Sequence, residues 1–269
     1  MPLFHLILVA LIQGVTEFLP ISSSGHLVLL PLLTGLDDQG QVIDIAAHVG
    51  TLFAVVIYFW SDVKQALEGG SRLVRGKVDT QGAWLALCLL ISCVPVIIVG
   101  LILKFTGLAD ATRSVTVIGW TMLAFGILLY WADQRAAQKK TNKNLSLKDA
   151  ARLGLWQVLA LIPGTSRSGI TITGALIHGY TRTDGARFAM LMSIPVIIAS
   201  GVLSSLDLAA GEVPVRDAAI VAAFSFLAAL AALALMMRLL RSVSFTPYVV
   251  YRVFLGIALL WLGYTGVIT

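Results

Sequence analysis

Six long apolar stretches divide the chain at similar intervals. They run over residues 41–60, 83–103, 115–132, 186–206, 218–237 and 249–268. A helix needs roughly 20 apolar residues to cross a hydrocarbon core about 30 Å thick. The pattern therefore predicts an all-α polytopic membrane protein with six full spans.

Two further apolar regions are too short to span a bilayer and are interrupted by polar residues. Residues 3–12 and 27–33 flank the segment QGVTEFLPISSSGH, and residues 153–162 and 170–180 flank PGTSRSG. Apolar runs this short are typical of re-entrant segments. A turn within the membrane is tolerated only when protein or a wet cavity surrounds it. We therefore expect two re-entrant helical hairpins in addition to the six spans.

The two interrupted regions match when the sequence is shifted by 144 residues. The matched pairs are Gln13 with Gln157, Ser22 with Ser166, Ser24 with Ser168, and Gly25 with Gly169. Three predicted spans follow each region, and an odd number of crossings gives the two halves opposite orientations. Inverted repeats with broken helices carry their site between the repeats. We expect one transmembrane domain over 1–269, with repeat 1 at roughly 1–135 and repeat 2 at roughly 148–269.

Composition and charge agree with a membrane protein and set its orientation. Only 12% of the 269 residues are charged and 58% are hydrophobic, whereas soluble domains average about 25% charged residues. The excess positive charge lies in loops 61–82 and 133–152 and at the ends of the later spans, where Arg252 is one example. Such loops are cytoplasmic. The charge thus indicates membrane orientation, with both termini outside, and no nucleic-acid partner is expected.

Ionisable side chains within apolar segments are costly in a bilayer and are candidates for function. These candidates are Glu17, His26, Asp44, His48 and Arg167. Opposed hairpins would bring Glu17, His26 and Arg167 together, although a purely structural pair of Glu17 with Arg167 is an alternative. Asp44 and His48 would support the site from behind it, or form a structural hydrogen bond with each other.

Gln13 and Glu17 are four residues apart, which places both on one helix face. A carboxylate and an amide there would hold a divalent cation or orient a nucleophile, because Mg²⁺ commonly takes one or two carboxylates together with substrate phosphates. Hydrogen bonding between helices is the alternative role for Gln13.

Two serine-rich turns carry the remaining candidates. Ser22, Ser23 and Ser24 precede Gly25 and His26. Successive amides at a helix start bind anions, and a serine beside an imidazole is a minimal nucleophilic pair, although a serine-rich turn can also be a simple helix cap.

The second turn places Arg167 between Ser166 and Ser168, with Thr171 one turn further along. A guanidinium with hydroxyls on either side suits bidentate phosphate binding. Two such turns facing each other would suit a pyrophosphate.

Four segments together resemble one family. QGVTEFLPISSSGH, IDIAAHVGTLFAV, PGTSRSGITITGAL and SFTPYVVYR are similar to segments of the bacterial undecaprenyl-pyrophosphate phosphatases, which are associated with bacitracin resistance. The resemblance covers nearly the whole chain. It implies hydrolysis of undecaprenyl pyrophosphate to undecaprenyl phosphate and inorganic phosphate with a divalent cation (Mg²⁺ or Ca²⁺), which recycles the lipid carrier for cell-wall synthesis. It also implies a multi-pass protein of the bacterial inner membrane whose site opens to the periplasmic face, and a homodimer is compatible with it.

The resemblance assigns roles to single residues. It implies an acid or amide at Gln13, the acid at Glu17, a hydroxyl at Ser23 and the catalytic histidine at His26. It also implies that Arg167 binds phosphate, with Ser166, Ser168 and Thr171 around it. The sequence departs from the family at Gln13, where many relatives have Glu, and at Ser24, where they often have Thr. Whether His26 attacks phosphorus directly, or acts as a base for Ser23 or water, stays open at this stage.

A different class of function fits the same layout. Inverted repeats with broken helices could alternate access and carry a polyprenyl phosphate across the membrane. A carrier needs anion-binding turns but not a histidine beside a serine and a carboxylate, so the enzyme is the expected function.

Overall fold

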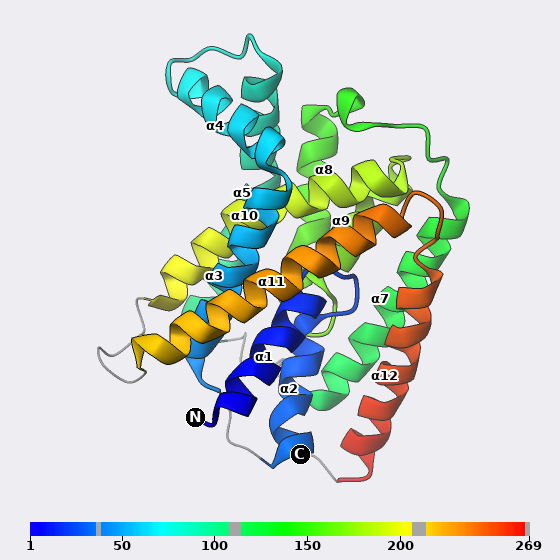
Figure 1. Ribbon diagram of the computed structural model, residues 1–269. Coiled ribbons are helices and arrows are strands. Elements are labelled where there is room, and N and C mark those ends of the chain that lie inside the picture. Colours follow the sequence, from blue (N-terminus) through cyan, green and yellow to red (C-terminus); the bar gives the residue numbers. More distant parts are fainter. Residues whose placement is uncertain (36–38, 108–113, 206–213, 267–269) are drawn as a thin grey trace.

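The computed structural model describes residues 1–35, 39–107, 114–205 and 214–266. Within these ranges the chain consists of helices and connecting segments, without a β-strand (Figure 1). Six helices are long and apolar enough to cross a membrane. They are α3 (Gln41–Tyr58), α5 (Gln81–Thr106), α7 (Val115–Arg135), α10 (Arg182–Ser205), α11 (Val215–Leu239) and α12 (Thr246–Tyr264). The six predicted spans are confirmed by length and composition, and residues 206 and 267–268 of the predicted ranges lie outside the described residues.

Both interrupted regions form a pair of short helices joined by a turn. Helices α1 (Leu3–Thr16) and α2 (Ser23–Thr34) flank residues 17–22, which we call the first turn. Helix α8 (Leu147–Val158) and the short 3-10 helix η2 (Leu159–Leu161) are followed by residues 162–166, the second turn, and by α9 (Arg167–Ile177). Each turn contains a proline, which cannot donate a helical hydrogen bond.

The last residue of each turn has an unusual backbone conformation. Ser22 has a φ of 72° and Ser166 a φ of 69°, in the left-handed region that residues other than glycine rarely adopt. The two serines occupy matched positions in the 144-residue shift. Strain of this kind costs of order 1–3 kcal/mol per residue and persists only where surrounding contacts impose it.

Helix α11 lies across α1 and α3 (Figure 1), and small residues make this close approach possible. A Cβ atom on Gly14 would meet Ala228 and the carbonyl of Ser225, and one on Gly50 would meet the carbonyl of Ala222. Small residues are the usual means by which membrane helices pack closely. The glycines therefore set the distance between α11 and the two helices beside it.

The predicted cytoplasmic loops contain more helix than the sequence pattern indicated. Helix α4 (Trp60–Val74) occupies most of loop 61–82, and the 3-10 helix η1 (Asn142–Asn144) lies in loop 133–152. The carboxylate of Asp62 in α4 accepts two hydrogen bonds from Arg187 in α10, at 2.9 and 2.5 Å. Helix α4 lies at the opposite end of the molecule from the start of α1 and the end of α12 (Figure 1).

Replacement of Gly50 by alanine should destabilise the fold, because the new Cβ would press against the backbone of α11. We expect a loss of about 1–3 kcal/mol, the usual cost of overpacking, measured as thermal unfolding in detergent. Gly70→Ala is the matched control, because nothing lies within 4 Å of its Cβ position. Alanine is the better helix former, by up to about 1 kcal/mol, so this variant should unfold at the same temperature or higher. Equal stability of the two variants would contradict the close α3–α11 contact.

Candidate active site between the two turns

The two turns, far apart in sequence, contact each other directly. The hydroxyl of Ser168 donates to the carbonyl of Leu19 at 3.0 Å, and the amide of Gly164 lies 3.4 Å from the hydroxyl of Ser24. These two hydrogen bonds confirm the expectation that the two serine-rich segments meet.

Arg252 of α12 joins both turns from behind, and sequence analysis missed this role. Its side chain is fully buried and donates to the carbonyls of Pro20 (3.3 Å), Gly164 (3.2 Å) and Thr165 (3.0 Å). It also donates to the carbonyl of Met122 in α7. The interpretation of Arg252 as a basic residue flanking a span was wrong, because the broken helices leave carbonyls that need donors. Its position inside an apolar helix was the signal that could have revealed it.

A cavity of about 220 Å³ lies where the turns meet. The predicted residues that line it are Glu17, Ser22, Ser23, Ser24, His48, Ser166 and Arg167. Helices α2 and α9 both begin at this cavity, and the start of a helix presents unpaired amides to an anion. The cavity thus combines hydroxyls, one guanidinium and two helix starts.

Glu17 is the centre of the polar network in this cavity. Its Oε1 accepts from the guanidinium of Arg167 at 2.6 Å. Its Oε2 accepts from the Gln13 amide at 2.8 Å and from the Ser23 hydroxyl at 3.0 Å. The carboxylate is only 8% exposed. The first turn therefore supplies a carboxylate that is bonded to the first residue of α2, and the first residue of α9 supplies the charge that balances it.

His48 lies closer to Glu17 than sequence analysis indicated. Its Nε2 is 3.8 Å from Oε2 of Glu17, and its Nδ1 is bonded to the main-chain carbonyl of Asp44 at 2.8 Å. The Asp44 side chain accepts from Gln39. Asp44 thus contacts the histidine through its backbone, and His48 is the member of this pair that lines the cavity.

His26 faces α12 and is not among the residues that line the cavity. Its Nδ1 is 2.7 Å from the Ser22 carbonyl, and its Nε2 is 2.6 Å from the hydroxyl of Tyr251. The two rings are nearly parallel, with centroids 5.5 Å apart and planes 3° apart. Tyr251 is a second residue that sequence analysis missed.

Three of the predicted phosphate-binding residues also point elsewhere. The Thr171 hydroxyl donates to carbonyls of its own helix, at Arg167 and Ser168. Ser168 is bonded to Leu19, and a Cβ atom on Gly25 would meet the sulfur of Met122 at 3.1 Å. These residues shape the turns without lining the cavity.

The donor set for a divalent cation is small. Within the described part of the chain, no group of three or more His, Cys, Asp or Glu side chains could hold a metal ion. The Oε1 atom of Gln13, next to Glu17, is buried without a hydrogen-bond partner. The amide nitrogen of Gln13 faces Glu17, and Gln13 does not line the cavity, so its oxygen would join the Glu17 carboxylate in holding a hard cation only if the amide turned over; substrate phosphates and water would supply the other ligands.

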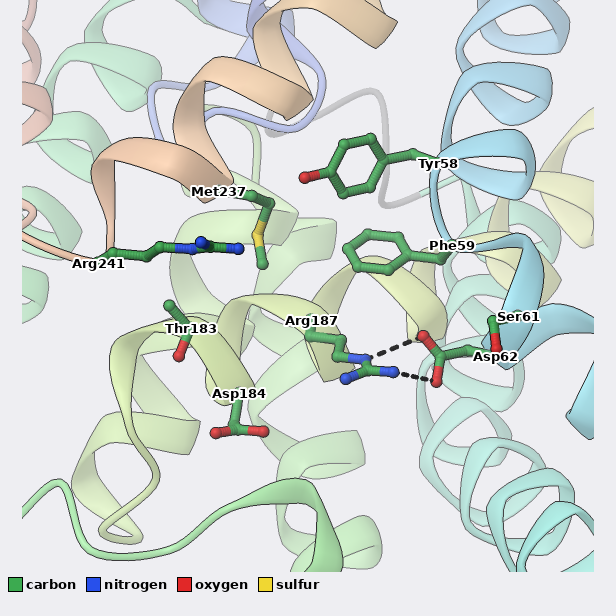
Figure 2. Close-up of a pocket in the computed structure, with 9 residues that line it drawn as sticks. All are labelled: Tyr58, Phe59, Ser61, Asp62, Thr183, Asp184, Arg187, Met237 and Arg241. Carbon is green, nitrogen blue, oxygen red and sulfur yellow. Dashed lines mark hydrogen bonds and ion pairs between the residues drawn. The ribbon is translucent and has the colours of Figure 1, made fainter.

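A second polar cavity, of about 440 Å³, lies where α3 and α11 end and α4 and α10 begin (Figure 2). Figure 2 shows the Asp62–Arg187 pair on one side of this cavity and Arg241 on the other. Asp184 accepts hydrogen bonds from Thr181 and from the amide of Asn142. None of the predicted site residues lines this cavity.

Comparison with known proteins agrees with the resemblance of the motifs. Residues 6–258 match the family described as bacitracin resistance protein BacA. The undecaprenyl-diphosphatase of Ruegeria pomeroyi is 65% identical over 267 residues, and that of Dinoroseobacter shibae 64% over 267, each covering 98% of this chain and 100% of the relative. Undecaprenyl-diphosphatase 1 of Rhodospirillum rubrum is 44% identical over 274 residues, covering 99% of this chain and 97% of the relative. The chain therefore belongs to the bacitracin resistance protein BacA family.

Proposed function

We propose that this protein is a membrane phosphatase that hydrolyses undecaprenyl pyrophosphate to undecaprenyl phosphate and inorganic phosphate, and so recycles the lipid carrier for cell-wall synthesis. The observation that carries the proposal is the bonding of Glu17 to both the Ser23 hydroxyl, at the start of α2, and the Arg167 guanidinium, at the start of α9, in one cavity. The relatives are named undecaprenyl-diphosphatase, which is the same chemistry.

The cavity binds the pyrophosphate, and the apolar surface beside it takes the lipid tail. Arg167 and the amides at the starts of α2 and α9 hold the phosphate oxygens. An apolar groove of about 570 Å³ runs along α1, α11 and α12 and includes Leu19 of the first turn. Because Leu19 is two residues from Glu17, the tail can lie in the groove while the headgroup enters the cavity.

Ser23 is the nucleophile of the proposed reaction. Its oxygen forms a bond to the terminal phosphorus while the bond from phosphorus to the bridging oxygen breaks, so that undecaprenyl phosphate leaves. Glu17 accepts the hydroxyl proton through its 3.0 Å hydrogen bond. Arg167 stabilises the negative charge on the transferred group. Water then hydrolyses the phosphoserine, which releases inorganic phosphate and restores Ser23.

His26 is set aside as nucleophile because Tyr251 occupies its Nε2 and because it lies outside the cavity lining. Of the two roles that the sequence left open for His26, direct attack on phosphorus and action as a base, the first is therefore not proposed.

Glu17 and the orphaned oxygen of Gln13 would hold a divalent cation, Mg²⁺ or Ca²⁺. When bound, such an ion supplies further neutralisation of phosphate charge. Only one of these two protein ligands is a carboxylate, so substrate oxygens would supply more of the cation's ligands than they would beside two acids.

The two broken helix pairs are re-entrant hairpins of inverted repeats, at roughly 1–135 and 148–269. Support comes from the matched positive φ of Ser22 and Ser166 and from serine pairs with the same spacing, Ser22–Ser24 at 3.0 Å and Ser166–Ser168 at 3.1 Å. The protein lies in the bacterial inner membrane with its basic loops in the cytoplasm, and its site opens to the periplasmic face. Both turns come from one chain, so the chemistry does not require a homodimer.

Transport of a polyprenyl phosphate by the same repeats is the alternative function. Purified protein in detergent separates the two, because a carrier without two compartments releases no phosphate from undecaprenyl pyrophosphate.

Arg167→Ala should lower phosphate release from undecaprenyl pyrophosphate by at least about 100-fold, because the charge developing on the phosphoryl group loses its stabiliser. Arg216→Ala, at an exposed position in the first turn of α11, is the control and should keep full activity. Near-wild-type turnover of Arg167→Ala would refute the proposed site.

Ser23→Ala should lower turnover by at least about 1,000-fold, as expected for a lost nucleophile. His26→Ala should retain more activity, and Ser205→Ala, at the exposed end of α10, should retain all of it. Rapid quenching followed by mass spectrometry should locate a phosphoryl group on Ser23. A phosphoryl group on His26, or an active Ser23→Ala variant, would contradict this assignment.

Gln13→Glu should lower the Mg²⁺ concentration needed for half-maximal activity, because a second carboxylate replaces a neutral amide oxygen beside Glu17. Gln157→Glu is the matched control, since Gln157 occupies the same position in the second repeat without an acid at Leu161. Chelation should abolish activity in both variants and in the wild type. An unchanged Mg²⁺ requirement in Gln13→Glu would place the cation elsewhere.

A further inference from the structure

The hydrogen bonds of His26 fix where its proton lies. The Ser22 carbonyl can only accept, so Nδ1 of His26, 2.7 Å away, carries a hydrogen. In the neutral ring, Nε2 is then an acceptor, and the Tyr251 hydroxyl at 2.6 Å donates to it. A chain of two hydrogen bonds therefore runs from α12 through the imidazole to the backbone of the first turn.

This chain ends at a strained residue. Ser22 has a φ of 72° and directly precedes Ser23. Its carbonyl must stay in place for the next amides and the Ser23 hydroxyl to keep their directions. The rings of Tyr251 and His26 are nearly parallel, with planes 3° apart and centroids 5.5 Å apart, and they meet edge to edge through the hydrogen bond between them.

The second turn provides an internal comparison. Ser166 adopts the same conformation but caps its own helix, with its hydroxyl accepting from the Gly169 amide at 3.1 Å. Ser22 makes no such cap. The position that matches His26 in the second repeat is Ile170. The turn with the cap thus has no histidine, and the turn without the cap has one.

We propose that Tyr251 is a positioning residue which, through His26, holds the Ser22 carbonyl and thereby orients Ser23 toward Glu17. Tyr251 is 43% exposed, and its hydroxyl is bonded to Nε2 of His26 at 2.6 Å. The adjacent Arg252 donates hydrogen bonds to both turns. Two consecutive residues of α12 therefore hold the backbone of the site, Tyr251 through His26 and Arg252 directly. The effect of Tyr251 on the reaction rate rests on the proposed phosphatase function, whereas its hydrogen bond to His26 does not.

The proton arrangement is tested by ¹⁵N NMR of histidine-labelled protein in detergent, with His26 assigned from a His26→Gln sample. We expect a protonated Nδ1 and an unprotonated Nε2 whose resonance moves downfield in Tyr251→Phe, because a hydrogen bond is lost. Tyr264→Phe is the control: Tyr264 lies on the same helix and accepts a hydrogen bond from Trp120, and its variant should leave the His26 signals unchanged. A proton on Nε2 in the wild type, or no change in Tyr251→Phe, would overturn the proposal.

The effect on catalysis is tested by a double-mutant cycle. Tyr251→Phe should lower kcat about fivefold, the scale of one hydrogen bond, with KM unchanged. In the His26→Gln background the same substitution should cause no further loss, because Tyr251 acts through His26. A raised KM, or a further fivefold loss in that background, would show direct contact with substrate and contradict a positioning role.

The positioning role of Tyr251 and the phosphatase function are refuted by different results. The NMR result needs no turnover, so a proton on Nε2, or His26 signals that do not change in Tyr251→Phe, would overturn the proposal even if His26→Gln is inactive. Absence of phosphatase activity in the wild-type protein would refute the proposed function without changing the state of His26.

Discussion

The buried guanidinium of Arg252 holds together two breaks in helical structure, and the site is built on those breaks. Each turn interrupts a helix and leaves main-chain carbonyls without partners, which is costly where water is scarce. Arg252 supplies donors to Pro20 in the first turn and to Gly164 and Thr165 in the second. A planar group with five N–H donors is suited to this task. It adds to the direct contacts between the two regions, in which Ser168 donates to Leu19 and Arg167 to Glu17.

The two turns have the same backbone conformation at their last residue but are followed by different side chains. Ser22 and Ser166 share a left-handed conformation, and the residue that follows is Ser23 in one case and Arg167 in the other. Glu17, before Ser22, is matched by Leu161 in the 144-residue shift. Two turns of matching conformation therefore present a hydroxyl with its carboxylate from one side and a guanidinium from the other. This asymmetry of sequence allows a single cavity to hold one substrate in one orientation.

Hydrophobic periodicity was enough to predict the six spans, because bilayer thickness sets helix length. The 144-residue shift was enough to predict that the two serine-rich segments meet. The directions of single side chains were not predictable in this way. His26 is bonded to a residue 225 positions away, and His48 approaches Glu17 from a separate helix. Arg252 was misread because basic residues near span ends usually face water, and only the packed structure reveals the carbonyls that surround it.

A structure with a non-hydrolysable analogue of a prenyl pyrophosphate, in which a methylene group replaces the bridging oxygen, tests the central claim most directly. The account predicts the terminal phosphonate in the cavity between the two turns, with Ser23 on one side and Arg167 on the other. The account would be contradicted if the headgroup bound in the cavity between Arg187 and Arg241 (Figure 2) and no phosphonate lay between the two turns.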